Sequence, residues 1–119
     1  MGVAKDAVGA YGERVAARHL QEAGLVVLDR NWRCADGELD IVARDGPALV
    51  FCEVKTRRSD RHGTPAEAVV AAKAARLRRL AGEWLRATGV HPDTIRFDVV
   101  SVRPQRTGPA RVEHLRGAF

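Results

Sequence analysis

The stretch that decides the fold is GELDIVARDGPALVFCEVK, residues 37–55. Two runs rich in apolar and β-branched residues, 38–44 and 48–55, flank the turn residues Asp45-Gly46-Pro47. Asp-Gly between apolar runs is a strong hairpin signal, so we expect two antiparallel strands over these runs. The second run is almost continuously apolar, as is typical of a strand that is covered on both faces.

Helical and strand-like patterns surround this hairpin. Helical spacing predicts a helix over 6–23 that ends at Gly24. A capping box, Thr64-Pro65-Ala66-Glu67, predicts the start of a second helix that ends at Gly89. Further strands are expected over 25–33, 95–102 and 111–115. The order α-β-β-β-α-β-(β) predicts one α/β domain, residues 1–119, with a mixed β-sheet flanked by helices.

Composition and charge narrow the class of partner. The content of 45% hydrophobic and 29% charged residues excludes a disordered basic tail. A net charge of +5 and a pI near 10.0 favour nucleic acid as the partner, with an acidic membrane surface or acidic protein second. No stretch has membrane-spanning length and no signal peptide is visible, so we expect a cytoplasmic protein with no membrane partner. Cys34 and Cys52 lack zinc-ligand spacing and are expected to be reduced structural thiols.

The chain uses arginine for 17 of its 20 cationic residues, which leaves 20 − 17 = 3 lysines, at Lys5, Lys55 and Lys73. A lysine kept in so arginine-rich a chain indicates a position that needs a compact or deprotonatable ammonium. Lys73 falls within the apolar stripe of the second helix, which predicts that it enters the covered side. The alternative is that its stem packs while its ammonium reaches solvent.

The predicted hairpin brings carboxylates together. Since side chains alternate along a strand, Glu38, Asp40 and Val42 should share one face and Leu39, Ile41 and Ala43 the other. A two-residue turn pairs positions whose numbers sum to an odd value. Asp40 then lies opposite Phe51 or Glu53, and Glu38 lies opposite Glu53 or Lys55.

Like charges about 5 Å apart repel, so these carboxylates need a compensating cation. Hard oxygen ligands select Mg²⁺, Mn²⁺ or Ca²⁺, and Lys55 supplies positive charge from the protein itself. The alternative is a set of solvated cross-strand salt bridges. In the first helix, Gly9 and Gly12 indicate close approach of the backbone to the sheet, with Glu13 beside the packed surface, although a solvated Glu13 is the simpler interpretation.

An ordered series of motifs resembles the bacterial YraN-like family, and its Asp40…Glu53-Val54-Lys55 resembles the site of the PD-(D/E)xK nuclease superfamily. The resemblance implies a restriction-endonuclease-like core similar to that of archaeal Holliday-junction resolvases. Leu39 stands where the superfamily name has proline. The motifs are Gly9-x-x-Gly12-Glu13, Arg30-Asn31-Trp32-Arg33, Gly37-Glu38-Leu39-Asp40, Phe51 to Arg57, Lys73, Arg96 to Val100 and a terminal Ala-Phe.

The resemblance also implies roles for individual residues. Asp40, Glu53 and the Val54 carbonyl would bind Mg²⁺ or Mn²⁺. Lys55 would orient the attacking water and Glu13 would assist the metal, while Lys73 would face the phosphate. Glu38 is adjacent, without an assigned role. The implied reaction is in-line attack of water on a phosphodiester, with the ion as Lewis acid.

Basic residues indicate where nucleic acid would bind. Arg57, Arg58 and Arg61 directly follow the third predicted strand, and a second arginine set lines the second helix. No aromatic stacking platform is visible, which favours duplex or branched DNA over single strands, with RNA left open. Analogy with resolvases is compatible with a homodimer. The alternatives are a noncatalytic nucleic-acid-binding protein and a basic protein-interaction domain.

Overall fold

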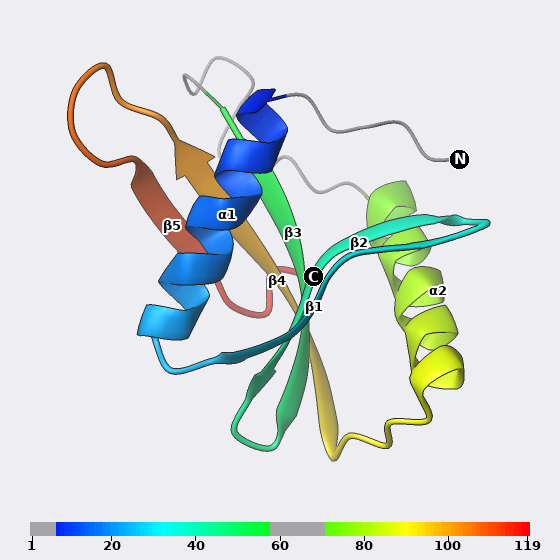
Figure 1. The fold of residues 1–119 in the computed structure, drawn as a ribbon. Coiled ribbons are helices and arrows are strands. Elements are labelled where there is room, and N and C mark those ends of the chain that lie inside the picture. The colour runs from blue at the N-terminus through cyan, green and yellow to red at the C-terminus, as the bar shows by residue number, and fades with distance from the viewer. Residues whose placement is uncertain (1–6, 58–70) are drawn as a thin grey trace.

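The computed structural model describes residues 7–57 and 71–119 (Figure 1). The elements follow the predicted order, and each predicted strand end differs from the observed one by at most one residue. The capping box at residues 64–67 lies outside the described residues. The elements are α1 (Ala7–Glu22), β1 (Val26–Cys34), β2 (Gly37–Asp45), β3 (Ala48–Thr56), α2 (Ala71–Thr88), β4 (Thr94–Arg103) and β5 (Arg111–Leu115).

The five strands form one mixed sheet in the order β1-β2-β3-β4-β5. Strands β3 and β4 are parallel and the other neighbours are antiparallel. Because α2 lies between β3 and β4 in the chain, it provides the crossover that a parallel pair needs. Figure 1 shows α1 and α2 on opposite sides of the sheet, which confirms the predicted α/β architecture.

Each helix packs its own apolar core against the sheet. On the α1 side, Leu20 packs with Ile41 and Val50, and on the α2 side Trp84 packs with Phe51. Successive residues of β3 therefore enter different cores, so this strand is covered on both faces as its sequence predicts.

The β2–β3 hairpin confirms the predicted register as far as Ile41↔Cys52, whereas the predicted pairing of Asp40 and Glu38 with residues of β3 does not form. Asp45 pairs with Ala48, so the two turn residues are Gly46 and Pro47, and Gly46 has a φ of +58°. A left-handed backbone of this kind favours glycine. Position numbers across the hairpin sum to an odd value, as in Ile41↔Cys52.

The predicted alternation along β2 is wrong at one place. Leu39 packs in the α2-side core whereas Ile41 packs in the α1-side core, although residues two apart should share a face. The pairing of β2 with β3 ends at Ile41↔Cys52, while the β1–β2 pairing continues to the tip. Opposite this point Asn31 has a φ of +54°, a conformation that asparagine tolerates better than most residues. The tip of the β1–β2 hairpin therefore turns towards α2 (Figure 1).

A buried ion network ties the sheet to the C-terminal segment. Asp98 accepts hydrogen bonds from Arg96 Nε and Nη2, both at 2.9 Å, and from the Gly117 N–H, and it lies 2.7 Å from His114 Nε2. Burial opposes ionisation, but these partners outweigh it and lower the pKa of Asp98 to about 2. All this charge is compensated internally, so the network is structural rather than a candidate site.

Gly12 sets the distance between α1 and the sheet. A Cβ at this position would lie 1.8 Å from Oγ1 and 2.9 Å from Cβ of Thr56, at the end of β3. The helix can sit this close to β3 only because residue 12 has no side chain, as the sequence predicts for a glycine inside a helix. The contact places the next residue, Glu13, against the sheet.

We predict that Gly12→Ala destabilises the protein by about 1–3 kcal/mol, the usual cost of overpacking. Thr56→Ala should recover part of that loss in the double variant, because it removes two of the three clashing atoms. Gly82→Ala is the matched control, since its Cβ would meet only the end of Arg86 at 3.7 Å. Urea denaturation measures all four proteins. A Gly12→Ala protein as stable as the Gly82→Ala protein would contradict the close contact.

Candidate functional site

The candidate site lies at the fork where β2 leaves β3. Asp40 is the first β2 residue beyond the last β2–β3 pair, and its Oδ2 accepts a hydrogen bond of 2.9 Å from the Val54 N–H. A backbone donor that is shielded from solvent needs a partner, and the partly buried N–H of Val54 bonds to a side chain in place of the missing strand. This bond fixes the Asp40 carboxylate beside the strand that carries Glu53 and Lys55.

Three carboxylates converge at the fork. Glu13 from α1 and Glu38 and Asp40 from β2 each offer an oxygen, and these oxygens lie within 4.8 Å of one another. We call them the acidic cluster. Glu13 is only 1% exposed, so it is no solvated helix residue. Glu38, to which sequence reasoning gave no role, is a full member, whereas Glu53 is not part of this group.

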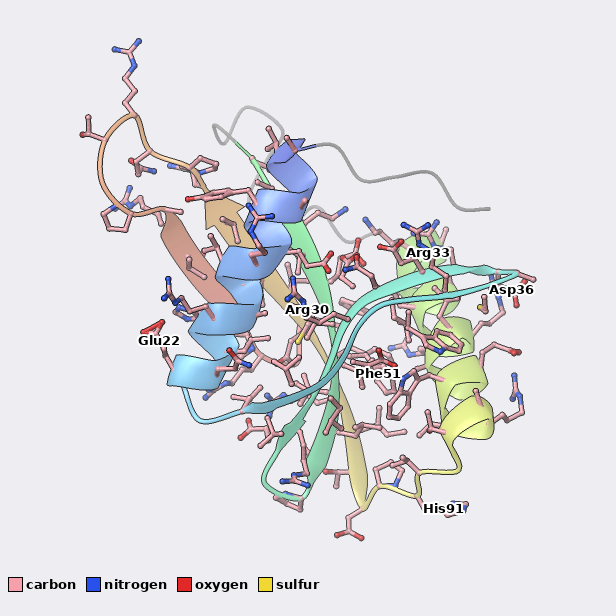
Figure 2. The ribbon with its side chains drawn as sticks, in the orientation of Figure 1. Glu22, Arg30, Arg33, Asp36, Phe51 and His91 are labelled. Atoms are coloured by element: carbon pink, nitrogen blue, oxygen red, sulfur yellow. The ribbon has the colours of Figure 1, made fainter. Side chains whose placement is uncertain are left out.

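Two arginines of β1 approach the acidic cluster. Arg33 Nε donates to Glu38 Oε2 at 2.9 Å, and Arg30 Nε lies 3.9 Å from Glu13 Oε1. In Figure 2, Arg30 lies between α1 and the β1–β2 hairpin, and Arg33 lies farther along towards α2. Sequence reasoning assigned neither residue a role, although both belong to the motif Arg30-Asn31-Trp32-Arg33 that carries the family resemblance.

Glu53 has different partners. Its Oε1 lies 2.8 Å from Lys73 Nζ of α2 and 3.3 Å from Lys55 Nζ. We call these three residues the lysine–glutamate cluster. The Lys73 ammonium therefore enters the covered side of the sheet, as its place in the apolar stripe predicts. Glu53 is 8% exposed, and a carboxylate this buried needs such compensation.

The lysine–glutamate cluster also changes the pKa of Lys55. Burial lowers the pKa of Lys55, the neighbouring Lys73 lowers it further, and the Glu53 carboxylate opposes both effects. Burial likewise raises the pKa of the Cys52 thiol, which keeps that thiol protonated in the α1-side core.

The acidic cluster has the chemistry of a divalent-cation site. Carboxylate oxygens suit Mg²⁺, Mn²⁺ and Ca²⁺ rather than softer metals. Two oxygens on one Mg²⁺ lie at most about 4.2 Å apart, and on one Ca²⁺ about 5 Å apart. The observed separations within 4.8 Å thus need only small side-chain movements. The N–H and C=O of one strand residue point to the same side, so the Val54 carbonyl faces the edge where Asp40 lies.

Of the arginines predicted to contact nucleic acid, Arg57 and those of α2 lie within the described residues. Arg57 is half-buried, and its backbone N–H donates to the Val102 carbonyl, while Arg58 and Arg61 lie outside the described residues. On α2, the Arg78 guanidinium lies 5.6 Å from the centre of the Phe97 ring, and Arg76 and Arg79 are exposed. Within the described residues, neither helix is long and apolar enough to cross a membrane.

Comparison with known proteins adds the family. Residues 12–102 match the family described as "Uncharacterised protein family UPF0102". The chain belongs to this family. The YraN-like membership predicted from the sequence is thereby confirmed.

Relatives match over almost their whole length. The chain is 62% identical over 116 residues to a UPF0102 protein of Frankia alni, covering 98% of this chain and 97% of that protein. It is 64% identical over 115 residues to one of Kineococcus radiotolerans, covering 96% and 94%. A Streptomyces griseus UPF0102 protein is 57% identical over 115 residues, covering 96% and 97%.

Among solved structures, Pyrococcus furiosus SfsA in complex with Ca²⁺ shows a distant similarity. The TM-score is 0.36 and the sequence identity 13%, with coverage of 92% of this chain and 62% of SfsA. A similarity of this size carries no argument about the site of the UPF0102 chain.

The Asp40–Val54 bond has a consequence for mutagenesis. We predict that Asp40→Ala lowers the free energy of unfolding by about 1–3 kcal/mol, the cost of a buried donor without a partner. Asp40→Asn keeps an oxygen acceptor at the same place and should cost much less. Urea denaturation in the presence of a chelator measures both. Equal stability of the two variants would mean that Asp40 has no structural role at the fork.

Proposed function

We propose that this UPF0102 protein is a metal-dependent nuclease that hydrolyses phosphodiester bonds in nucleic acid, with duplex or branched DNA as the first candidate substrate. The observation that carries the proposal is the position of Asp40. Its carboxylate belongs to the acidic cluster and also binds the backbone between Glu53 and Lys55. Oxygen ligands for a cation and ammonium groups for a phosphate are therefore joined at one fork.

The acidic cluster would hold the cation. Glu13, Glu38 and Asp40 offer three oxygens from two elements, and the Val54 carbonyl is available at the same edge. Mg²⁺ or Mn²⁺, when bound, supplies Lewis-acid charge to a phosphate and lowers the pKa of water. Asp40 is held by a backbone hydrogen bond, so this ligand is positioned before any cation arrives.

The lysines would act on the phosphate and the water. Lys55 and Lys73 present two compact ammonium groups on one side of the sheet, both in contact with Glu53. The lowered pKa of Lys55 makes this ammonium a better proton donor than an exposed lysine. Lys55 would orient the attacking water and stabilise charge on the phosphate, with Lys73 facing the phosphate from α2. These roles of the two lysines are the ones that the PD-(D/E)xK resemblance implies.

One observation favours the noncatalytic alternative. The Glu53 carboxylate, which the resemblance assigns to the metal, is already compensated by two ammonium groups. The negative charge of Glu53 therefore needs no metal cation to compensate it, as expected for a nucleic-acid-binding protein on a nuclease-like scaffold. Turnover separates the two functions.

The proposal is tested by cleavage and by cation binding together. With Mg²⁺ or Mn²⁺, we expect cleavage of at least one substrate among duplex, nicked, flapped, four-way and single-stranded DNA and duplex RNA. Asp40→Asn and Glu38→Gln should each lower the rate by at least about a hundredfold. Calorimetry with Mn²⁺ should show weaker binding in both variants, because each loses a charged ligand. Wild-type affinity for Mn²⁺ in both variants would exclude the acidic cluster as the cation site.

Glu53→Gln is the informative comparison in the same titration. A loss of Mn²⁺ affinity as large as that of Asp40→Asn would include Glu53 among the ligands, which requires its lysines to move. Unchanged affinity would restrict coordination to the acidic cluster. The absence of cleavage on every substrate by the wild-type protein would favour the noncatalytic alternative.

Lys55 gives a sharper prediction about mechanism. Lys55→Arg keeps the charge near Glu53, so binding of DNA and of Mn²⁺ should stay close to wild type. The broader guanidinium cannot place a compact charge at the same point, and cleavage should fall by at least about a hundredfold. Arg79→Lys, an exposed exchange on α2, is the control for changing one cationic side chain. Cleavage by Lys55→Arg at the wild-type rate would count directly against the role of Lys55.

A further inference from the structure

A cavity of about 480 Å³ lies beside the acidic cluster, within the usual size range of ligand sites. Three arginines from α1 and β1 line it, and Glu13 is the acidic residue among the described residues of its lining. We call it the arginine pocket. Its lining residues are Ala10, Glu13, Arg14, Arg30, Asn31 and Arg33.

The backbone of Asn31 explains how the pocket forms. In a regular strand, residues three apart point to opposite faces, so Arg30 and Arg33 should not line one cavity. Asn31, between them, has a φ of +54°, and this left-handed residue breaks the alternation. Both arginines then reach the acidic cluster, Arg30 at Glu13 and Arg33 at Glu38. Arg14 joins them from α1.

The arginines remain accessible to a ligand. The side chains of Arg30 and Arg33 are 40% and 39% exposed, and Arg14 is exposed as well. Arg30 Nε lies 3.9 Å from Glu13 Oε1, a contact that is an ion pair but too long for a hydrogen bond, so it leaves the Nε donor of Arg30 available to a ligand. A planar guanidinium matches the paired oxygens of a phosphate, which a compact ammonium does not.

We propose that the arginine pocket grips a backbone phosphate of the nucleic acid. This inference rests on the proposed function, because it supplies the substrate contact for that same site. A phosphate in the pocket lies beside Glu13, so the strand to which it belongs runs past the acidic cluster. The net charge of +5 and the two lysines near the cluster favour a polyanion with repeated phosphates over a single small anion.

The test measures binding alone. A short fluorescein-labelled DNA duplex is titrated with protein in EDTA and in Ca²⁺ over a series of salt concentrations, with fluorescence anisotropy as the readout. The pocket variant is Arg14→Gln with Arg30→Gln. The matched control is Arg106→Gln with Arg111→Gln, which removes two exposed arginines that the site does not include, one before β5 and one at its start. Each double variant removes two positive charges, so the comparison cancels the effect of net charge.

We expect the pocket variant to bind at least about tenfold more weakly at low salt and to lower the salt slope by about 0.9 for each phosphate that the protein no longer neutralises. The matched control should keep the wild-type slope. A pocket variant with wild-type affinity and slope overturns the proposal, and so does an equally weakened control variant. Arg14→Gln alone, on an exposed side chain of α1, gives a second measurement that does not disturb the Arg30–Glu13 pair.

Cleavage measured separately keeps the two proposals apart. If the pocket variant binds DNA more weakly while the wild-type protein cleaves nothing, the pocket is supported and the nuclease is refuted. A pocket variant that binds and cleaves at the wild-type level refutes the pocket and leaves the nuclease standing. Arg30→Lys completes the set, because a specific guanidinium contact should be weakened by lysine whereas simple charge attraction should not.

Discussion

Strand β3 loses its β2 neighbour beyond Cys52, and the backbone N–H of Val54 must then find another partner. The Asp40 carboxylate provides it at 2.9 Å. Because this bond fixes Asp40 at the opening between two strands, the remaining geometry follows. Glu38 and Glu13 meet Asp40 there, and the strand that receives the bond carries the lysine–glutamate cluster. A sheet that stayed paired to its end would leave no room for this convergence.

The close approach of α1 is the second condition. Glu13 reaches the fork only because Gly12 has no side chain that would clash with Thr56. The cost of a glycine inside a helix is about 1 kcal/mol relative to alanine, and burying the Glu13 carboxylate is itself unfavourable, so this arrangement lowers stability in order to place Glu13. Stability and the candidate site are therefore linked through one contact of α1 with β3.

Local sequence rules were enough for the elements, the hairpin register and the two-sided burial of β3, because each depends on neighbours along the chain. They failed at Leu39, because side chains alternate only along a regular strand. The irregularity lies beside Leu39, where Asn31 of the neighbouring strand has a left-handed backbone. Alternation places Glu38 on the face of Asp40, where the acidic cluster forms, but it does not predict the arginine pocket. The motif that includes Arg30 and Arg33 can be recognised in the sequence. That both side chains line one pocket depends on the left-handed backbone of Asn31, which the spacing of apolar residues does not predict. The position of Lys73 could be predicted, because a lysine within the apolar stripe of a helix lies on the face that packs against the sheet.

Charge balance at the fork explains why a cation and a phosphate would bind better together than apart. Within the described part of the chain, the acidic cluster, its two β1 arginine partners and the lysine–glutamate cluster contain four carboxylates and four cationic side chains, so the formal charge of these eight groups is 4 − 4 = 0. A divalent cation alone would leave an excess of positive charge, and a phosphodiester alone an excess of negative charge. Each therefore compensates the other, and by linkage each would raise the affinity of the other equally. The side chains are Glu13, Glu38, Asp40 and Glu53 against Arg30, Arg33, Lys55 and Lys73. Since Arg33 donates a hydrogen bond to Glu38, which would also hold the cation, coordination would release this guanidinium for the phosphate, and the two ligands would be coupled through Arg33 as well as through net charge.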